Sequence, residues 1–423
     1  MSAEVTRLAN GITVVTQTAS HLETSALGVW VDAGARHERA DEHGLSHLLE
    51  HMAFKGTGTR STRDIAEEIE AVGGELNAAT GLESTAYFAR VLKGDEGVAF
   101  GIIADILQNS TFADEELEKE REVILQEIAG TLDSPDDLAF DLVHDAAFPD
   151  QPAGRTILGT PKSVKSISSN KLKAFLAERY HPKGMVLAGA GAIRHEDAVR
   201  HARALFGGLS NVSPGPEEPA KYKGGVRSSS RKFEQAHLIV GFEAPSYRDE
   251  AFFAAQVFSG LLGGGMSSRL FQEVRERRGL CYAIYSTAWG LKDTGLFAVH
   301  AATGAGMVGE LIDVVSDEID RMADAGPTDA EVARAKAQLK AGLMMSLESS
   351  SARAEQMARQ MLLHGRVLPT SELIDCVDRV TAQEVVAVAR GLRRSDAAVS
   401  VVGAGRKSDD LAQRAGLRLK LVA

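Results

Sequence analysis

Residues 44–57 read GLSHLLEHMAFKGT, and this stretch decides how the rest of the chain is interpreted. His47, Glu50 and His51 fall among leucines and a methionine that are spaced as on an amphipathic helix. On a helix, positions four apart share a face, so the two imidazoles lie one turn apart, as two ligands of one zinc ion require. Glu50 projects from the same side and can stand beside the ion without binding it. The pattern is H-x-x-E-H, the inverted form of H-E-x-x-H; the alternative is a solvated helix face that carries the same side chains.

A zinc ion that takes part in chemistry needs a third protein ligand and an open fourth position. Residues 114–129 are predicted to form a helix on which Glu116, Glu120 and Glu127 fall on one stripe. Glu120 and Glu127 are two turns apart, about 10 Å along the axis, so both cannot bind one ion directly. Glu127 lies in the apolar context VILQEIAG, which implies burial, and a buried carboxylate favours a cation, so it is the predicted ligand. Glu120, among Lys and Arg in LEKEREV, is predicted to orient a histidine or to join a proton relay.

The length of the chain predicts two domains, because 423 residues exceed the roughly 250–300 at which single hydrophobic cores stop growing. A boundary is indicated by GGLSNVSPGPEEPAKYKGGVRSSSR, which is rich in Gly, Pro, Ser and charge. The prediction is a metal-binding domain over 1–208, a linker over 209–231 and a second domain over 232–423. The order of elements is similar in both halves, which indicates a duplication in which the first copy kept a carboxylate-rich site. The predicted fold class is α+β, with two homologous domains that are each a mostly antiparallel sheet covered by helices.

Composition excludes several other classes of protein. The formal net charge of -11 argues against nucleic acid as a partner, which would need a basic face. No apolar run approaches the roughly 20 residues that cross a bilayer, and the first residues lack the pattern of a secretory signal, so a cytoplasmic protein that does not enter membranes is expected. The two cysteines form no CxxC pair and predict neither a disulfide framework nor a thiolate metal site. The histidines outside the motif lack ligand spacing and are predicted to be structural or exposed.

Several further segments occur in a recognisable order along essentially the whole chain: GGELNAATGLESTAYFARVL, EREVILQEI and GGGMSSRLFQEVRERRGLCYAIYS. Together with HLLEH they make the chain similar to the inverzincin metallopeptidases of the pitrilysin and mitochondrial processing peptidase family, in the single-chain bacterial form of about 420 residues. The resemblance implies that His47, His51 and Glu127 bind Zn²⁺, that Glu50 is the general base, and that Glu120 supports the site.

The resemblance also implies how a peptide would be held. GELNAATG resembles the family's exposed edge strand, to which an extended peptide adds as another strand, and Asn77 and Ala78 match positions that face the scissile bond. The alternative is that Asn77 only satisfies a turn. Arg275 and Tyr282 match a pair that relatives bring from the half without zinc, where the tyrosine bonds the oxyanion and the arginine holds the substrate backbone. Surface charge and sheet packing are the alternative for this pair.

The resulting hypothesis is a zinc-dependent endopeptidase acting on unfolded peptides or precursor segments. In family members of this size two chains form a clamshell, so a homodimer is expected in which Arg275 and Tyr282 of one chain complete the site of the other. Two alternatives stay open. The chain could be a non-catalytic partner subunit, or one subunit of a heterodimeric processing peptidase whose other chain supplies the arginine and tyrosine.

Overall fold

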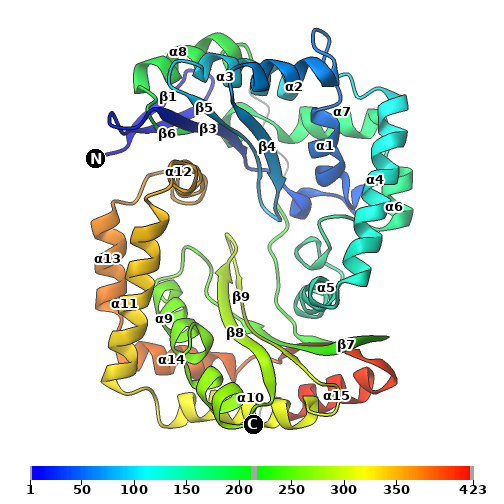
Figure 1. Cartoon of the computed structure of the whole chain (residues 1–423), viewed down its shortest axis with the longest axis vertical. Coiled ribbons are helices and arrows are strands. Elements are labelled where there is room, and N and C mark those ends of the chain that lie inside the picture. The colour runs from blue at the N-terminus through cyan, green and yellow to red at the C-terminus, as the bar shows by residue number, and fades with distance from the viewer. Residues whose placement is uncertain (1, 211–216, 420–423) are drawn as a thin grey trace. The chain divides into compact units, whose positions relative to one another are not determined.

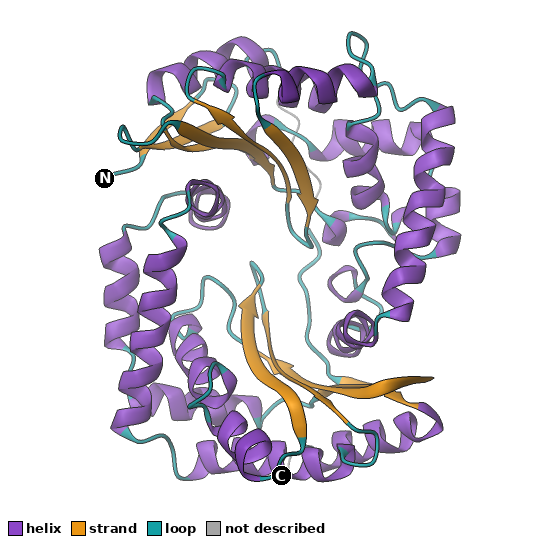
Figure 2. Cartoon of the chain, viewed as in Figure 1, coloured by secondary structure: helices purple, strands orange, loops and turns teal. Residues whose placement is uncertain are grey.

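The computed structural model describes residues 2–210 and 217–419, which form two compact units (Figure 1). Unit 1 comprises Met1–Ile128, Thr156–Glu218 and Met344–Pro369. Unit 2 comprises Ala129–Arg155, Pro219–Leu343 and Thr370–Ala423. Each unit therefore includes a segment from the other half of the sequence. In both units one sheet is flanked by helices (Figure 2), which confirms the predicted α+β class.

Unit 1 contains a sheet of six strands in the order β1-β2-β6-β3-β5-β4. Its strands are β1 (Glu4–Arg7), β2 (Thr13–Thr18), β3 (Thr24–Val31), β4 (Glu75–Thr80), β5 (Thr85–Leu92) and β6 (Met185–Gly191). Only the pair β2 and β6 is parallel, and the other neighbours are antiparallel. The strand β4, which contains Asn77 and Ala78, is the last in the order and leaves one edge without a partner strand among the described residues.

The helices of unit 1 cover both faces of this sheet. They are α1 (Leu45–Ala53), α2 (Thr62–Ala71), α3 (Glu96–Gln108), α6 (Pro161–Ser166), α7 (Ser169–Arg179), α8 (His195–Phe206), α12 (Ser350–His364) and most of α4 (Asp114–Asp133), with 3-10 turns η1 (Ala35–His37), η2 (Ala40–Glu42) and η4 (Pro182–Gly184). Helices α1, α3 and α4 contribute to the main core on one face. On the other face, Met357 and Met361 of α12 pack with Val15, Trp30 and Val186 of the sheet.

Unit 2 repeats the topology of unit 1 with four strands: β7 (Gly225–Glu243), β8 (Cys281–Gly290), β9 (Gly295–Thr303) and β10 (Ala398–Ala404). The long strand β7 pairs with β10 twice. The register pairs Val399 with Val226 in the same direction, and also with Val240 in the opposite direction, so β10 lies between the two ends of β7. The two ends of β7 therefore take the places of β2 and β3, while β10, β9 and β8 take those of β6, β5 and β4. This repeated order supports the predicted duplication.

The helices of unit 2 pack on its sheet and around it. They are α5 (Pro135–Ala147), α9 (Phe252–Gly263), the π-helix η5 (Phe271–Arg277), α10 (Val308–Asp324), α11 (Asp329–Ser346), α13 (Thr370–Arg379), α14 (Ala382–Leu392) and α15 (Ser408–Arg418), with 3-10 turns η3 (Pro152–Gly154) and η6 (Gly405–Lys407). Within the described part of the chain, no helix combines the length and the apolar character needed to cross a bilayer.

The predicted linker over 209–231 falls partly outside the described residues, because 211–216 are not described. Its last residues begin strand β7. These residues are mostly polar and partly exposed. Backbone pairing with β10 holds them in the sheet, and Val226 packs against the core of unit 2. Polar composition alone therefore did not distinguish a strand from a linker here, and the predicted domain boundaries stay a prediction.

Candidate metal centre

The first turn of α1 fixes where His47 and His51 point. Gly44 precedes the helix with φ of 91°, and a Cβ there would lie 2.7 Å from the carbonyl oxygen of Leu158, so the position requires glycine. The buried carboxylate of Glu38 accepts hydrogen bonds from the backbone N–H groups of Gly44 (2.8 Å) and Ser46 (2.7 Å) and so satisfies the start of the helix. The helix buries its apolar side chains completely: Leu45, Leu48, Leu49 and Met52. The opposite side presents His47, Glu50 and His51.

The structure brings His47, His51 and Glu127 together within unit 1. The Glu127 Oε2 atom lies 3.7 Å from His47 Nε2 and 3.8 Å from His51 Nε2, and all three ligand atoms lie within 4.8 Å of one another. Tetrahedral zinc with ligands at about 2.0–2.1 Å places its ligand atoms roughly 3.3 Å apart. The two separations to Glu127 exceed this value by about half an ångström, so a small closing movement would let the three residues hold zinc. The Glu127 side chain is 41% exposed, which leaves the group open on one side.

Glu120 lies behind His51, on the same helix as Glu127. Its carboxylate accepts a hydrogen bond from His51 Nδ1 at 3.0 Å. It also forms an ion pair with Lys55 Nζ at 2.7 Å. Burial acts to raise the pKa of Glu120, but the hydrogen bonds from Lys55 and His51 outweigh it and lower that pKa below its usual range. An ionised Glu120 fixes the His51 tautomer with the proton on Nδ1, so the Nε2 lone pair faces Glu127.

His47 and Glu50 each keep one polar atom without a hydrogen-bond partner among the described residues. These atoms are His47 Nδ1 and Glu50 Oε2, and both are buried. Burial, together with the neighbouring His51, lowers the pKa of His47 to about 4, so its imidazole is neutral, the form that binds metal. Partnerless buried polar atoms are uncommon in proteins and often mark a place where a ligand completes the bonding.

The charge of Glu50 acts on two buried tyrosines, Tyr87 and Tyr180. The hydroxyls of Tyr87 and Tyr180 lie 3.2 Å apart. Burial raises the pKa of Tyr87, and it raises that of Tyr180 to about 12; in both cases the charge of Glu50 adds to the effect. Both tyrosines are therefore neutral at physiological pH. Nothing in the sequence marks them, because two isolated aromatic residues 93 positions apart are typical of a hydrophobic core.

Asn77 and Ala78 lie in the edge strand β4 beside α1. Thr80 Oγ1, at the end of this strand, donates to the carbonyl oxygen of Ser46 at 3.4 Å. Asn77 is exposed and its Oδ1 accepts from the N–H of Ala78 at 2.8 Å, whereas Ala78 is buried. Asn77 thus belongs to a strand, and the alternative that it satisfies a turn does not fit.

Arg275 and Tyr282 contact each other in unit 2, whereas His47 and its neighbours belong to unit 1. Arg275 lies in the π-helix η5, with its guanidinium carbon 5.2 Å from the ring centroid of Tyr282 and 4.8 Å from that of Phe271. Tyr282 is 76% exposed. Because most of Tyr282 is exposed beside the Arg275 guanidinium, the pair is available for contact with another molecule.

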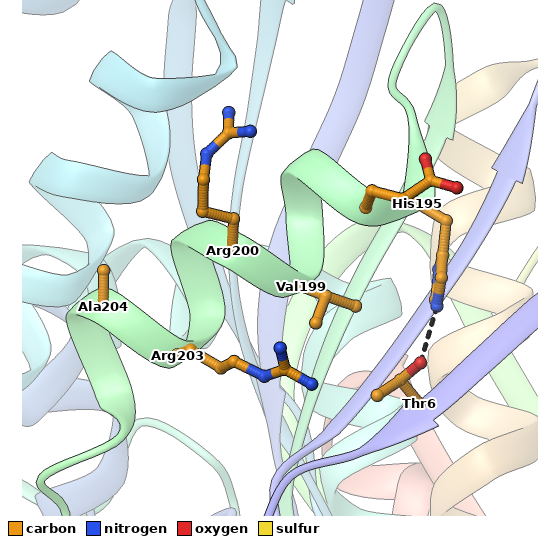
Figure 3. A pocket seen from close by; sticks show the side chains of 7 residues that line it. Thr6, His195, Val199, Arg200, Arg203 and Ala204 are labelled. Carbon is orange, nitrogen blue, oxygen red and sulfur yellow. Dashed lines mark hydrogen bonds between the residues drawn. The ribbon is translucent and has the colours of Figure 1, made fainter.

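A separate hollow of about 610 Å³ in unit 1 contains none of the predicted site residues (Figure 3). It is lined by Thr6, His195, Glu196, Val199, Arg200, Arg203 and Ala204. His195 Nε2 lies 2.8 Å from the Thr6 hydroxyl, drawn as a dashed line in Figure 3, and Nδ1 lies 2.8 Å from that of Thr16. With both ring nitrogens bonded to hydroxyls, His195 has the structural role expected of it.

Comparison with known proteins identifies the family. Residues 13–161 match the family model described as insulinase (peptidase family M16), and residues 166–339 match the one described as the peptidase M16 inactive domain. The chain belongs to peptidase family M16. This confirms the resemblance drawn from HLLEH and its companion segments. The match of the second half to a domain described as inactive agrees with the lack of an H-x-x-E-H motif there.

Relatives of similar length carry the name of zinc protease. The chain is 38% identical over 400 residues to an uncharacterized zinc protease of Rickettsia bellii, covering 94% of this chain and 97% of the relative. It is 38% identical over 407 residues to an uncharacterized zinc protease of Streptomyces coelicolor, covering 94% and 89%. A probable mitochondrial-processing peptidase subunit beta of Arabidopsis thaliana is 38% identical over 415 residues, covering 94% and 78%.

Solved structures show the same fold. A protease from Helicobacter pylori matches with a TM-score of 0.86 at 21% identity, covering 95% of this chain and 99% of the other. A Pseudomonas fluorescens structure described as a peptidase M16 inactive domain matches with a TM-score of 0.87 at 23% identity, covering 95% and 98%. These likenesses establish the duplicated peptidase M16 fold.

Proposed function

We propose that this protein is a zinc-dependent endopeptidase that hydrolyses unfolded peptides or precursor segments in the cytoplasm. The observation that carries the proposal is the convergence of His47, His51 and Glu127 in unit 1, with Glu50 on the same helix as the histidines. Membership of peptidase family M16 and the names of the relatives support zinc and peptide hydrolysis. When bound, the ion would polarise the scissile carbonyl as a Lewis acid and make water a better nucleophile.

The residues around the ion then have distinct tasks. Glu50 takes a proton from water as the water oxygen bonds to the carbonyl carbon, and delivers it to the nitrogen as the C–N bond breaks. Its buried Oε2, without a hydrogen-bond partner among the described residues, is free for this transfer. Glu120 and Lys55 act as positioning residues, because they hold His51 in the tautomer that presents Nε2.

The peptide would lie along β4 at Asn77 and Ala78. The outer edge of this strand offers backbone N–H and C=O groups to an added strand, and β4 lies beside the helix that carries the histidines. Backbone pairing gives affinity without demanding a particular sequence, while alternate side chains tune preference. This mode of binding requires an extended substrate and so favours unfolded peptides.

Arg275 and Tyr282 are proposed to act in a homodimer, in which they reach the site of the other chain. There the Tyr282 hydroxyl would donate to the oxyanion, and Arg275 would hold the substrate backbone. The exposure of Tyr282 and its stacking on Arg275 support a role toward a second molecule.

The proposal is tested by Glu50→Gln, which removes the proton acceptor and changes little else. We expect peptide hydrolysis to fall by about 10²–10⁴-fold while the zinc content stays at the wild-type value, measured by a peptide-cleavage assay and elemental analysis. Glu122→Gln, an exposed position on α4, is the matched control and should leave both unchanged. Full hydrolysis by Glu50→Gln would show that the assigned mechanism is wrong.

A second candidate function is that of a subunit in a heterodimeric processing peptidase, since one relative carries the name of such a subunit. In that case the chain purified alone would be inactive, or would need another chain for activity. A peptidase assay with and without a chelator, together with a measurement of molecular size, separates the two. Chelator-sensitive activity in a dimer of this chain alone would reject the heterodimer.

A further inference from the structure

We propose that Asp136, His237 and His300 form a second metal site, in unit 2, for a divalent transition metal ion of the zinc class. The proposal does not depend on the proposed peptidase function, because none of these residues belongs to the candidate centre on α1 and α4. The three residues come from α5, β7 and β9, and all three lie in the same compact unit.

The sheet register explains how the two histidines meet. His237 of β7 pairs with Ala302 of β9, and His300 stands two residues before Ala302, so the histidines occupy diagonal positions on one face of the sheet. Tyr285 of β8 pairs directly with His300 and shares that face. Helix α5 contacts this sheet and places Asp136, from its first turn, against both rings. Both imidazoles are buried, with 7% and 4% exposure for His237 and His300.

The distances fit a tetrahedral ion. Asp136 Oδ1 lies 2.9 Å from His300 Nε2 and 3.5 Å from His237 Nδ1, and the two ring nitrogens lie 3.1 Å apart. Zinc with ligands at about 2.0–2.1 Å requires ligand atoms roughly 3.3 Å apart. These separations scatter around that value, and they come closer to it than those of the candidate centre in unit 1.

Hydrogen bonding between neutral rings cannot satisfy all three contacts. If His237 Nδ1 donates to His300 Nε2, that nitrogen has no proton left for Asp136, and the carboxylate faces a lone pair. If His300 Nε2 donates to Asp136 instead, it cannot accept from His237. A single cation at the centre accepts lone pairs from all three atoms at once.

The residues indicate which ion fits and how it enters. Two imidazoles and one carboxylate suit zinc and other first-row divalent ions. Calcium and magnesium prefer oxygen ligands, so a site with two imidazoles disfavours them. The Asp136 side chain is 48% exposed, so the group is reachable from solvent on that side. A carboxylate in a first helical turn also interacts favourably with the helix dipole, and this is the rival explanation for Asp136.

The test uses the full chain with the first centre disabled by His47→Ala and His51→Ala. After dialysis against buffered zinc, we expect this background to retain about one ion per chain, and to lose it when Asp136→Asn or His300→Gln is added. Cobalt in place of zinc should give visible absorption bands that disappear with the same substitutions. The matched control is His144→Phe, because His144 lies on α5, is partly buried, stacks on Trp289, and is not one of the three proposed ligands.

Two results would overturn the proposal. The background could hold no zinc or cobalt after dialysis, or Asp136→Asn could hold as much as the background does. Should the background fail to fold, Asp136→Asn in the otherwise intact chain must lower the zinc content by about one ion per chain relative to His144→Phe. An unchanged content in that comparison would equally reject the site.

Discussion

The two histidine–carboxylate groups of this chain are built in opposite ways. In unit 1, His47 and His51 stand four residues apart on one helix, and only Glu127 comes from elsewhere. In unit 2, the group is assembled from a helix and two strands, and its two histidines are 63 residues apart in sequence. A ligand pair on a helix is visible in the sequence because helical geometry fixes it locally. A pair across two strands becomes visible only when the strand register is known.

The surroundings of the two groups differ as well. His51 is held through Nδ1 by Glu120, whereas His300 Nδ1 is buried without a hydrogen-bond partner among the described residues. In unit 1, Glu50 is available beside the ligands as a proton acceptor. In unit 2, Asp136 is the one carboxylate of the group and is itself a proposed ligand, so the group includes no second carboxylate to accept a proton. We therefore expect the first group to serve hydrolysis and the second to serve stability.

The largest effect is expected in a test of whether unit 2 of one chain completes the site in unit 1 of the other chain. Tyr282→Phe removes only the hydroxyl proposed to bond the oxyanion, and Glu50→Gln removes only the proton acceptor; each variant alone should be nearly inactive. Co-expressed with different tags, they form mixed dimers in which one site combines an intact Glu50 with an intact Tyr282 from the partner. We expect about a quarter of wild-type peptide hydrolysis to return, because half of the dimers are mixed and each has one complete site.

The control for this experiment is a mixture of the two variants purified separately and not allowed to exchange. If the co-expressed pair is no more active than that mixture, Tyr282 does not act on the partner's site. Tyr282→Phe with full activity on its own would instead remove the tyrosine from the mechanism.

The sequence predicted the first group well because its signals are local. The apolar spacing of HLLEH predicted the helix that α1 forms, and the stripe on 114–129 predicted the helix that carries Glu120 and Glu127. The apolar context of Glu127 predicted burial, yet its side chain is 41% exposed and Glu120 is the buried one. The residue types around a position indicate the average environment of a helix. They do not show which carboxylate faces the protein interior.

Other parts could not be read from the sequence, for physical reasons. The start of β7 resembles a linker because most of its side chains are polar, whereas the backbone pairing with β10 that holds it in the sheet leaves no mark on the composition. The packing of α12 on the sheet of unit 1 depends on contacts between segments more than 150 residues apart, for which the sequence carries no local signal. His237 and His300 are predicted to be structural or exposed, because neither belongs to a segment with ligand spacing.

A smaller effect is expected from Glu120→Gln, which sharpens the contrast between a supported histidine and an unsupported one. The neutral amide bonds His51 Nδ1 more weakly than the carboxylate does, so we expect zinc affinity at the first centre to fall by about 10–100-fold. Competition with a chelator measures this affinity. In steady-state kinetics at saturating zinc, kcat should lie closer to its wild-type value than the zinc affinity does. Glu118→Gln, at an exposed position on the same helix, is the control. Unchanged zinc affinity in Glu120→Gln would leave Glu120 with only a packing role.

The smallest effect concerns the stability that an ion in unit 2 would contribute. A ligand that binds only the folded state stabilises it by RT ln(1 + [L]/Kd), so zinc at about ten times Kd adds about 1.4 kcal/mol to the free energy of unfolding. In the background with His47→Ala and His51→Ala, thermal unfolding should show this gain with zinc, and a chelator should remove it. The gain should persist in His144→Phe and vanish in Asp136→Asn, which replaces a half-exposed carboxylate by an amide of nearly the same shape. If zinc stabilises Asp136→Asn as much as His144→Phe, the gain arises from an ion elsewhere on the chain, and the first-turn position of Asp136 reflects only the helix dipole.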